Sequence, residues 1–468
     1  MTGVASREKG LPSKAVVLRT ALTAWLARPL TSFHLVLAVF GLLTALGLVM
    51  VLSASSVASY SAEGSSYLFF QKQLAYCAVG LVLFWLVLRI PPRVMRQLSP
   101  LAMVVGLLLL ILVLTPLGAD INNTRSWFVI GGWVSFQPIE FSKLALVLWG
   151  AHVLVTKRAL LHQYRHLLVP VVPAALLMFT LVMLQPDLGG TITLGLVLLA
   201  LLWFAGAPMR LFAALLLGAV TGATVLAVVA EYRLERIVAF LSSECDPSNE
   251  CFQAQQALYA LANGGLFGKG LGQATSKWDY LPNAHNDFIF AVIGEELGFV
   301  GCLVVLALYA TLAYVGLRIA ARNTDPWIRL VAATLTVWLV GQAAINIGYV
   351  VGLLPVTGLT LPLISSGGTS VVVTMIVFGM LANFARHEPE AVAALRSQGP
   401  GRVGRFLRLP MPDPYRPPVR RRPARPSTPP RGVGRPVGAS GRATTSGTAD
   451  RRRGRRTGSN DQRRRSAR

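Results

Sequence analysis

Long apolar runs with few or no charged residues occupy most of this chain. A helix needs about 20 apolar residues to cross the hydrocarbon core of a bilayer. Eight single runs have or approach this length: 33–62, 73–88, 101–119, 141–156, 167–186, 188–209, 211–230 and 297–317. A ninth run, 330–385, is long enough for two helices joined by the Pro- and Gly-rich segment 355–368. The pattern predicts an all-α integral membrane protein with ten transmembrane helices.

Composition and charge agree with this class and predict an orientation. Only 14% of the residues are charged, against about 25% in soluble proteins. The net charge of +24 comes mainly from residues 386–468, which hold 22 arginines and five acidic residues, whereas 33–385 is nearly neutral. Lys and Arg favour cytoplasmic loops, and with both termini in the cytoplasm 37 of the 44 basic residues lie inside. This distribution does not suit a nucleic-acid-binding protein.

Three regions are expected along the chain. Residues 1–32 form a basic cytoplasmic segment, and residues 33–386 form the ten-span membrane domain. Residues 387–468 are rich in Arg, Pro, Gly, Ser and Thr and lack an apolar period, so they are predicted to be a disordered cytoplasmic tail. Two interpretations of the tail remain open: it binds an anionic lipid surface or a cytoplasmic partner, or it only fixes the topology.

The largest segment expected outside the membrane is 231–296, between the seventh and eighth spans. A loop of this length is usually functional or disordered. It contains many aromatic and apolar residues and an amphipathic stretch, 253–263, that is followed by two glycines. We therefore expect an ordered, partly helical lid. Cys245 and Cys251 lie in this loop, where oxidation is permitted, and are predicted to form a disulfide.

A carboxylate at the end of this loop is the strongest candidate for chemistry. Asp287 precedes an apolar helix, where an ionisable residue is costly unless it is paired or functional. Apolar surroundings raise a carboxyl pKa and nearby cations lower it, so a balanced carboxylate can act as a general base. The alternative is that Asp287 only caps the helix. Glu295 and Glu296 follow in the same helix, and structural hydrogen bonding is the favoured interpretation for both.

A second outer cluster contains Arg125 and a predicted helix start with Gln137, Glu140 and Lys143. Glu140 and Lys143 are three residues apart and therefore share a helix face. One interpretation is that Arg125 and Lys143 receive an anionic head group such as a pyrophosphate. The other is an interfacial salt bridge between Glu140 and Lys143, with Arg125 extending toward the water.

Two Pro- and Gly-rich segments, 185–190 and 355–370, interrupt the predicted spans. Irregular backbone at membrane depth occurs only where protein or a wet cavity covers it. Both segments are therefore expected to line one outer cavity, with Asp187 in the first and with hydroxyl and N–H groups of 365–370 available to a phosphate or sugar. A simple re-entrant turn is the alternative for 365–370. The sequence has no zinc-ligand spacing and no phosphate-binding loop motif.

Four motifs occur in a fixed order along the chain. They are Arg-Ser-Trp with Gln-Pro-Ile-Glu-Phe-Ser-Lys, then Gln-Pro-Asp-Leu-Gly, then Leu-Pro-Asn-Ala-His-Asn-Asp-Phe-Ile-Phe with Gly-Glu-Glu-Leu-Gly, and finally Pro-Val-Thr-Gly-Leu with Ile-Ser-Ser-Gly-Gly. Over about residues 33–386 the chain resembles the SEDS family (shape, elongation, division and sporulation), and most closely its cell-division branch. Asn286 stands where Thr is usual, Ser366 stands where an aromatic residue is common, and the two loop cysteines are a further departure.

The resemblance implies a peptidoglycan glycosyltransferase that polymerises lipid II at the outer face of the bacterial cytoplasmic membrane, at the division septum. It implies Asp287 as the catalytic base and a class B penicillin-binding protein as partner, with other division proteins bound through the basic tail. Arg125, Lys143 and Lys277 would stabilise the departing pyrophosphate. The other expected substrate contacts are Gln137, Glu140, Asp187, His285, Asn286, Ser365, Ser366 and Gly367.

No cofactor is established by the sequence, although a divalent cation, Mg²⁺ or Mn²⁺, could share the charge of the pyrophosphate. Two other functions compete with the enzyme. A lipid II flippase would suit the many spans and broken helices, and a division scaffold would suit the tails. The main ionisable cluster lies at one face, and no chain of carboxylates crosses the midplane, so the enzyme is favoured over the transporter.

Overall fold

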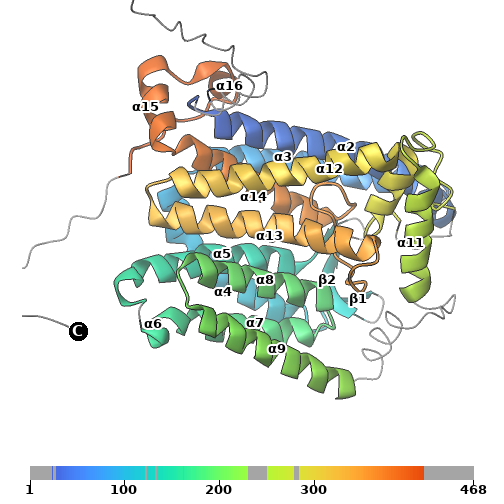
Figure 1. Cartoon of the computed structure of the whole chain (residues 1–468), viewed down its shortest axis with the longest axis horizontal. Coiled ribbons are helices and arrows are strands. Elements are labelled where there is room, and N and C mark those ends of the chain that lie inside the picture. The colour runs from blue at the N-terminus through green and yellow to red at the C-terminus, as the bar shows by residue number, and fades with distance from the viewer. Residues whose placement is uncertain are drawn as a thin grey trace, which may run out of the picture. The chain divides into compact units, whose positions relative to one another are not determined.

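The fold comes from a computed structural model that describes residue 24 and residues 28–121, 124–131, 134–161, 163–229, 250–278 and 284–415 (Figure 1). Seven helices are long and apolar enough to cross a membrane: α2 (Thr31–Glu63), α3 (Leu68–Arg89), α4 (Pro92–Leu112), α5 (Pro138–Thr156), α12 (Ile289–Arg322), α13 (Pro326–Val350) and α14 (Gly368–Arg386). Three further apolar helices accompany them: α7 (Val171–Met183), α8 (Leu188–Phe204) and α9 (Met209–Val229).

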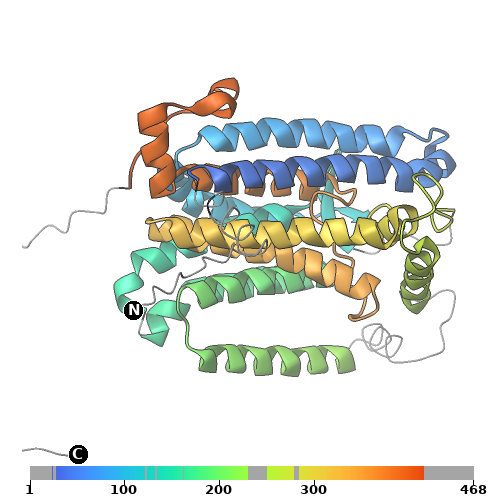
Figure 2. The same ribbon diagram turned by 45° about the horizontal axis from the view of Figure 1, so that its top comes forward.

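These helices extend along one common direction (Figure 1, Figure 2). α14 packs against α3 and α2, α12 packs against α13 and α2, and α5 packs against α4 and α8. The predicted class, a mainly helical membrane protein, is confirmed. The count of ten spans and the cytoplasmic location of both termini remain predictions.

Helix boundaries differ from the predicted runs at two places. α4 begins at Pro92, well before the expected start at 101, because proline is well tolerated in a first helical turn. The run 167–186 is divided into a short helix, α6 (Tyr164–Leu168), and α7. A 3₁₀ turn at Arg158–Leu160 completes the connection from α5.

Three short strands form an antiparallel sheet that the all-α prediction missed. They are β1 (Ala119–Ile121), β2 (Thr124–Ile130) and β3 (Val134–Phe136), in the order β1-β2-β3. β2 is rich in β-branched and aromatic residues, which favour strands. The strands are short and lie in a segment between two spans, so the sequence pattern indicated only a polar loop there. Ser135 in β3 fixes the sheet to the helices: its N–H donates to the Tyr76 hydroxyl at 2.8 Å, and its carbonyl accepts from Thr369 at 3.1 Å.

The outer segment contains the predicted helix. α11 (Glu250–Gly264) covers the expected stretch 253–263. The following loop packs against α12 at Gly298, whose φ of 68° is non-helical. A Cβ atom at Gly298 would overlap the backbone of Leu266 and Gly268, so this close approach requires glycine. Cys245 and the side chain of Cys251 lie outside the described residues, so the disulfide stays a prediction.

Two carboxylates in α12 hold this loop in place. Glu295 accepts hydrogen bonds from the Thr275 hydroxyl at 2.6 Å and from the Lys269 Nζ at 3.0 Å. Glu296 accepts from the Ser53 hydroxyl of α2 at 2.6 Å and lies 3.7 Å from the Lys277 Nζ. Both carboxylates are buried, and buried charges are tolerated where they are paired and hydrogen-bonded. These contacts agree with the structural interpretation of both residues.

The predicted disordered tail is wrong for its first part. α15 (Pro389–Gln398) and α16 (Gly401–Phe406) lie within it, and the ordered chain continues to residue 415. Leu395 and Leu409 are buried, and Arg386 donates to the Pro410 carbonyl at 2.7 Å. The ordered segment could not be predicted from the composition, because a few apolar residues are enough to dock a short segment on the helix bundle and they hardly change the average composition. Residues 416–468 lie outside the described part of the chain.

Candidate active site

One cavity of about 350 Å³ is lined by residues from each of the four motif segments of the sequence. Its wall comes from β2, from the first turns of α5, α8 and α14, from the loop before α12, from α13, and from the segment between α13 and α14. The lining residues include Ser126, Trp127, Gln137, Glu140, Asp187, Gly189, Gly190, Asn286, Asp287, Gln342, Thr357, Gly358, Thr360, Ser366, Gly367 and Ser370. The expectation that the segments 185–190 and 355–370 share a cavity is confirmed.

Three helices begin at this cavity. α5 begins at Pro138, α8 at Leu188 and α14 at Gly368, and residues of each first turn or N-cap line the wall. The N-terminus of a helix carries a partial positive charge and unpaired N–H groups, so it attracts anions. At α14 the N-cap is Gly367, which has no side chain to satisfy those groups. The start of α14 is therefore the part of the wall best suited to an anionic group, because the starts of α5 and α8 carry the carboxylates Glu140 and Asp187.

Asp287 is the carboxylate best suited to proton transfer. Its Oδ1 is buried without a hydrogen-bond partner, and its pKa is raised to about 6 because burial penalises the charged form. The alternative role as a helix cap does not hold: α12 begins at Ile289, its N-cap is Phe288, and that N-cap has no side-chain hydrogen bond. An unpartnered carboxylate in a cavity wall is available to a substrate hydroxyl.

The backbone at Asp287 is held by two residues of α13. The Asp287 carbonyl accepts from the Asn346 Nδ2 at 2.9 Å and from the Tyr349 hydroxyl at 2.8 Å. The same two groups also lie 2.6 Å and 2.7 Å from the Leu359 carbonyl. A further bond, from the Ser366 N–H to the His285 carbonyl at 3.0 Å, joins the two loops. We call Asn346 and Tyr349 the α13 clamp, because they fix the loop of Asp287 to the segment between α13 and α14.

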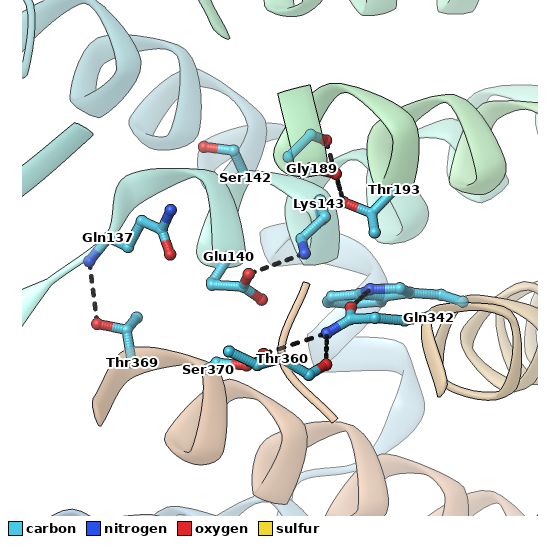
Figure 3. A network of polar contacts seen from close by, with 12 residues as sticks. Gln137, Glu140, Ser142, Lys143, Gly189, Thr193, Gln342, Thr360, Thr369 and Ser370 are labelled. Carbon is cyan, nitrogen blue, oxygen red and sulfur yellow. Dashed lines mark hydrogen bonds and ion pairs between the residues drawn. The ribbon is translucent and has the colours of Figure 1, made fainter. Parts of the chain in front are cut away.

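A buried ion pair supports the opposite wall. The Lys143 Nζ lies 2.9 Å from the Glu140 Oε1, and only 1% of the Lys143 side chain is exposed (Figure 3). The same Nζ lies 4.9 Å from the centre of the Trp338 ring. Glu140 lines the cavity and Lys143 lies behind it, so the lysine balances the charge of the glutamate.

The wall continues from this pair to Gln342 of α13. The Trp338 indole donates to the Gln342 Oε1 at 3.0 Å, and the Gln342 Nε2 donates to the Thr360 carbonyl at 2.9 Å (Figure 3). Both polar ends of the Gln342 amide are thereby used. Gln342 therefore has a fixed orientation at the cavity surface.

Asp187 joins the starts of two helices. Its Oδ1 accepts from the Gly190 N–H at 2.6 Å and thereby caps α8, and its Oδ2 accepts from the Gln137 Nε2 at 3.2 Å. The Gln137 N–H donates in turn to the Thr369 hydroxyl at 3.0 Å (Figure 3). These bonds fix α5, α8 and α14 relative to one another around the cavity.

Two of the predicted cationic contacts lie elsewhere. Arg125 does not line the cavity, although its neighbours in β2 do; its side chain is 52% exposed and lies 3.7 Å from Asp120. Lys277 donates to the Gly272 carbonyl at 2.6 Å and pairs with Glu296. A role for either residue in binding pyrophosphate stays a prediction.

Two predicted polar contacts serve the loops instead. The His285 ring lies 5.5 Å from the Phe69 ring, and its pKa is lowered because burial penalises the charged form. The Ser365 hydroxyl accepts from the Leu361 N–H at 2.7 Å. Neither side chain is part of the cavity wall, whereas Asn286, Ser366 and Gly367 are.

Three further polar residues of the site, Gln342, Asn346 and Tyr349, were not predicted from the sequence. They lie in the apolar run 330–385 at spacings of four and three residues, which place them on one face of α13. A polar stripe within an otherwise apolar span is itself a signal of function or of buried hydrogen bonding, and it could have identified them.

Comparison with known proteins identifies the family of this chain. The family model of the FtsW, RodA and SpoVE cell cycle proteins matches residues 33–390. The chain belongs to this family, which is the SEDS family.

Individual relatives are similar to this chain over most of their length. The probable peptidoglycan glycosyltransferase FtsW of Mycobacterium tuberculosis is 52% identical over 401 residues, which are 86% of this chain and 76% of that protein. A chain from the structure described as "Structural coordination of polymerization and crosslinking by a peptidoglycan synthase complex" has a TM-score of 0.62 and 29% identity, and covers 78% of this chain and 99% of that chain. The rod shape determining protein RodA of Thermus thermophilus has a TM-score of 0.56, with the same identity and coverage.

Proposed function

We propose that this protein is a peptidoglycan glycosyltransferase that polymerises lipid II at the outer face of the cytoplasmic membrane during cell division, with Asp287 as the general base. The observation that carries the proposal is the unpartnered Asp287 carboxylate in a cavity where three helix N-termini meet. The name of the Mycobacterium tuberculosis relative supports the activity.

The reaction needs little beyond positioning, charge stabilisation and one proton acceptor. The donor sugar is already activated by its undecaprenyl pyrophosphate, so no nucleotide is required. Asp287 takes the proton of the acceptor hydroxyl. The hydroxyl oxygen forms a bond to the anomeric carbon of the donor sugar, and the pyrophosphate departs with the electrons of the broken bond. The start of α14, which has no side-chain cap, would stabilise the departing anion, because fixed dipoles in a site with little water act strongly on developing charge.

The cavity also fits a substrate-bound divalent cation. Asp187 and Asp287 both line it, and Mg²⁺ usually takes one or two carboxylates from a protein together with substrate phosphates. Within the described residues no group of three His, Cys, Asp or Glu side chains could hold a metal alone. The ion would be held mainly by the pyrophosphate, whose charge it would partly neutralise, because both Asp187 oxygens already accept hydrogen bonds and Asp287 must stay free to act as the base.

A class B penicillin-binding protein is the proposed partner. The structure of a peptidoglycan synthase complex that coordinates polymerisation and cross-linking supports this, since one of its chains shares this fold. Leu266, Phe267 and Trp278 are exposed on the loop after α11 and offer an apolar contact surface. Other division proteins would bind through residues 416–468.

Polymerisation of labelled lipid II by the purified protein tests the proposal. The protein is assayed with and without a cognate class B penicillin-binding protein, beside Asp287→Ala. Glycan ladders from the wild type and none from the variant are expected. Transfer of lipid II across liposomes without any ladder would instead favour a flippase.

Polymerisation should depend on pH through Asp287. The pKa of this carboxyl is raised from its ordinary value to about 6, so it is largely protonated below pH 6 and cannot accept a proton. The rate is expected to fall by about tenfold per pH unit below about pH 6 and to level off above it. A pH–rate profile measures this, with a parallel unfolding measurement to show that the protein stays folded. A flat profile across this range would contradict the assignment.

The α13 clamp should affect turnover more than substrate binding. In Asn346→Ala and Tyr349→Phe the Asp287 carbonyl loses a donor, so the base can move away from the acceptor hydroxyl. kcat is expected to fall about 10- to 100-fold with a smaller change in KM, as for other misplaced reacting groups. Tyr314→Phe, at an exposed position of α12, is the matched control. An unchanged kcat in both clamp variants would show that the loops hold their position without α13.

A further inference from the structure

The short helix α16 is attached to the end of α3 through its apolar side. Val403 and Leu407 pack against the hydrophobic core. The Leu407 carbonyl accepts from the Trp85 indole at 3.1 Å and from the Arg89 guanidinium at 3.3 Å. The Arg89 guanidinium also lies 3.8 Å from the centre of the Trp85 ring. α16 is therefore fixed by several independent contacts.

These contacts place α16 at the level where the membrane meets the water. Trp85 and Arg89 lie in the last two turns of α3, and Val82 and Leu86 on the same helix are exposed apolar residues. Tryptophan concentrates at membrane interfaces, and arginine concentrates at cytoplasmic helix ends. α16 lies at the end of the bundle opposite to α11 and the sheet (Figure 1, Figure 2). The distribution of basic residues assigns that end to the cytoplasm.

The outward side of α16 combines one aromatic ring with several positive charges. Phe406 is 86% exposed, the highest value among the large apolar residues of the described chain. Arg402, Arg405 and Arg408 are all exposed beside it, and Asp413 is the only acidic residue in 401–415. An exposed apolar side chain surrounded by cations is typical of helices that lie in the surface of an anionic membrane.

We propose that α16 and Arg408 bind the anionic phospholipids of the cytoplasmic leaflet. The three guanidinium groups contact lipid phosphates, to which arginine is geometrically matched, and the Phe406 ring enters the boundary between head groups and acyl chains. Because Leu407 is fixed to Trp85 and Arg89, this surface is presented at interface height by the folded bundle. The site is distinct from the catalytic cavity and requires neither polymerisation nor lipid II.

Depth-sensitive fluorescence in the full-length protein tests this proposal. An environment-sensitive fluorescent amino acid replaces Phe406, and the protein is reconstituted in bilayers of phosphatidylcholine alone or mixed with phosphatidylglycerol. Quenching by lipids with brominated acyl chains reports contact with the membrane. The same probe at Ser397, an exposed position of α15, is the matched control.

The probe at position 406 should be quenched on the order of twofold more than the probe at 397, and more strongly when phosphatidylglycerol is present. High salt should remove the phosphatidylglycerol-dependent part, since it screens exposed charges. The triple variant Arg402→Gln, Arg405→Gln, Arg408→Gln should also remove it, while lipid II polymerisation stays at the wild-type rate.

Equal quenching at the two positions would overturn the proposal, because α16 would then not reach the membrane. Quenching at 406 that does not depend on phosphatidylglycerol, on salt or on the arginine substitutions would also overturn it, because the arginines would then not be binding anionic lipid. In the first of these cases Phe406 would be an exposed surface available to a protein partner.

Discussion

Asp287→Asn is expected to abolish detectable lipid II polymerisation while leaving the fold intact. The substitution preserves size and removes the proton-accepting charge, and general base catalysis typically contributes about 10²- to 10⁴-fold to a rate. Because the Oδ1 of Asp287 has no hydrogen-bond partner in the folded protein, the change breaks no side-chain contact at that atom. Glycan ladder formation by the purified variant measures the effect.

Stability measurements should separate this loss from unfolding. Asp287→Asn should unfold at the wild-type temperature or above, because a neutral amide is easier to bury than a carboxylate. Asp413→Asn makes the same chemical change at an exposed position and should retain full activity. Normal ladders from Asp287→Asn would exclude the general-base role.

Lys143→Met is expected to destabilise the protein strongly. The lysine is 1% exposed and pairs with Glu140 at 2.9 Å, so its removal leaves a charged carboxylate unpaired in the interior. Breaking a buried pair by removing one partner costs about 3–5 kcal/mol. Unfolding of the purified protein in one detergent, followed for the wild type and the variant together, measures the difference. Polymerisation should fall as well, because Glu140 lines the cavity.

The control for this experiment is an ion pair of the same kind at the surface. Arg125 lies 3.7 Å from Asp120, and both side chains are more than half exposed. Arg125→Met should therefore cost less than about 1 kcal/mol. Adding Glu140→Gln to Lys143→Met should recover part of the lost stability, since it removes the unpaired charge. A single Lys143→Met variant as stable as Arg125→Met would show that Glu140 is neutralised without the lysine.

The helical class could be predicted because an apolar segment that crosses a bilayer satisfies its backbone hydrogen bonds by forming a helix. The segments 185–190 and 355–370 could be assigned to one cavity because helix breaks at membrane depth need a common wet space, and the family resemblance added Asn286 and Asp287 to that site. The order of the motifs along the chain then indicated the family. Each of these inferences depends on residue type and position alone.

The direction of individual side chains could not be predicted in the same way. Arg125 and Lys277 have the charge that a pyrophosphate needs, but their ion pairs with Asp120 and Glu296 are set by tertiary contacts. The α13 clamp was hidden because Asn346 and Tyr349 lie within an apolar span. The sheet and α15 were missed for a related reason: their stability comes from the bundle on which they dock.

The cavity wall has a consequence for the synthesis of this chain on the ribosome. Its first contributions come from Thr124 and Ser126, and its last comes from Ser370, near the start of α14. No fragment that ends before α14 contains a complete site. A nascent chain is therefore catalytically silent until α14 has been made and has entered the membrane, so chains that end before α14 cannot build wall material.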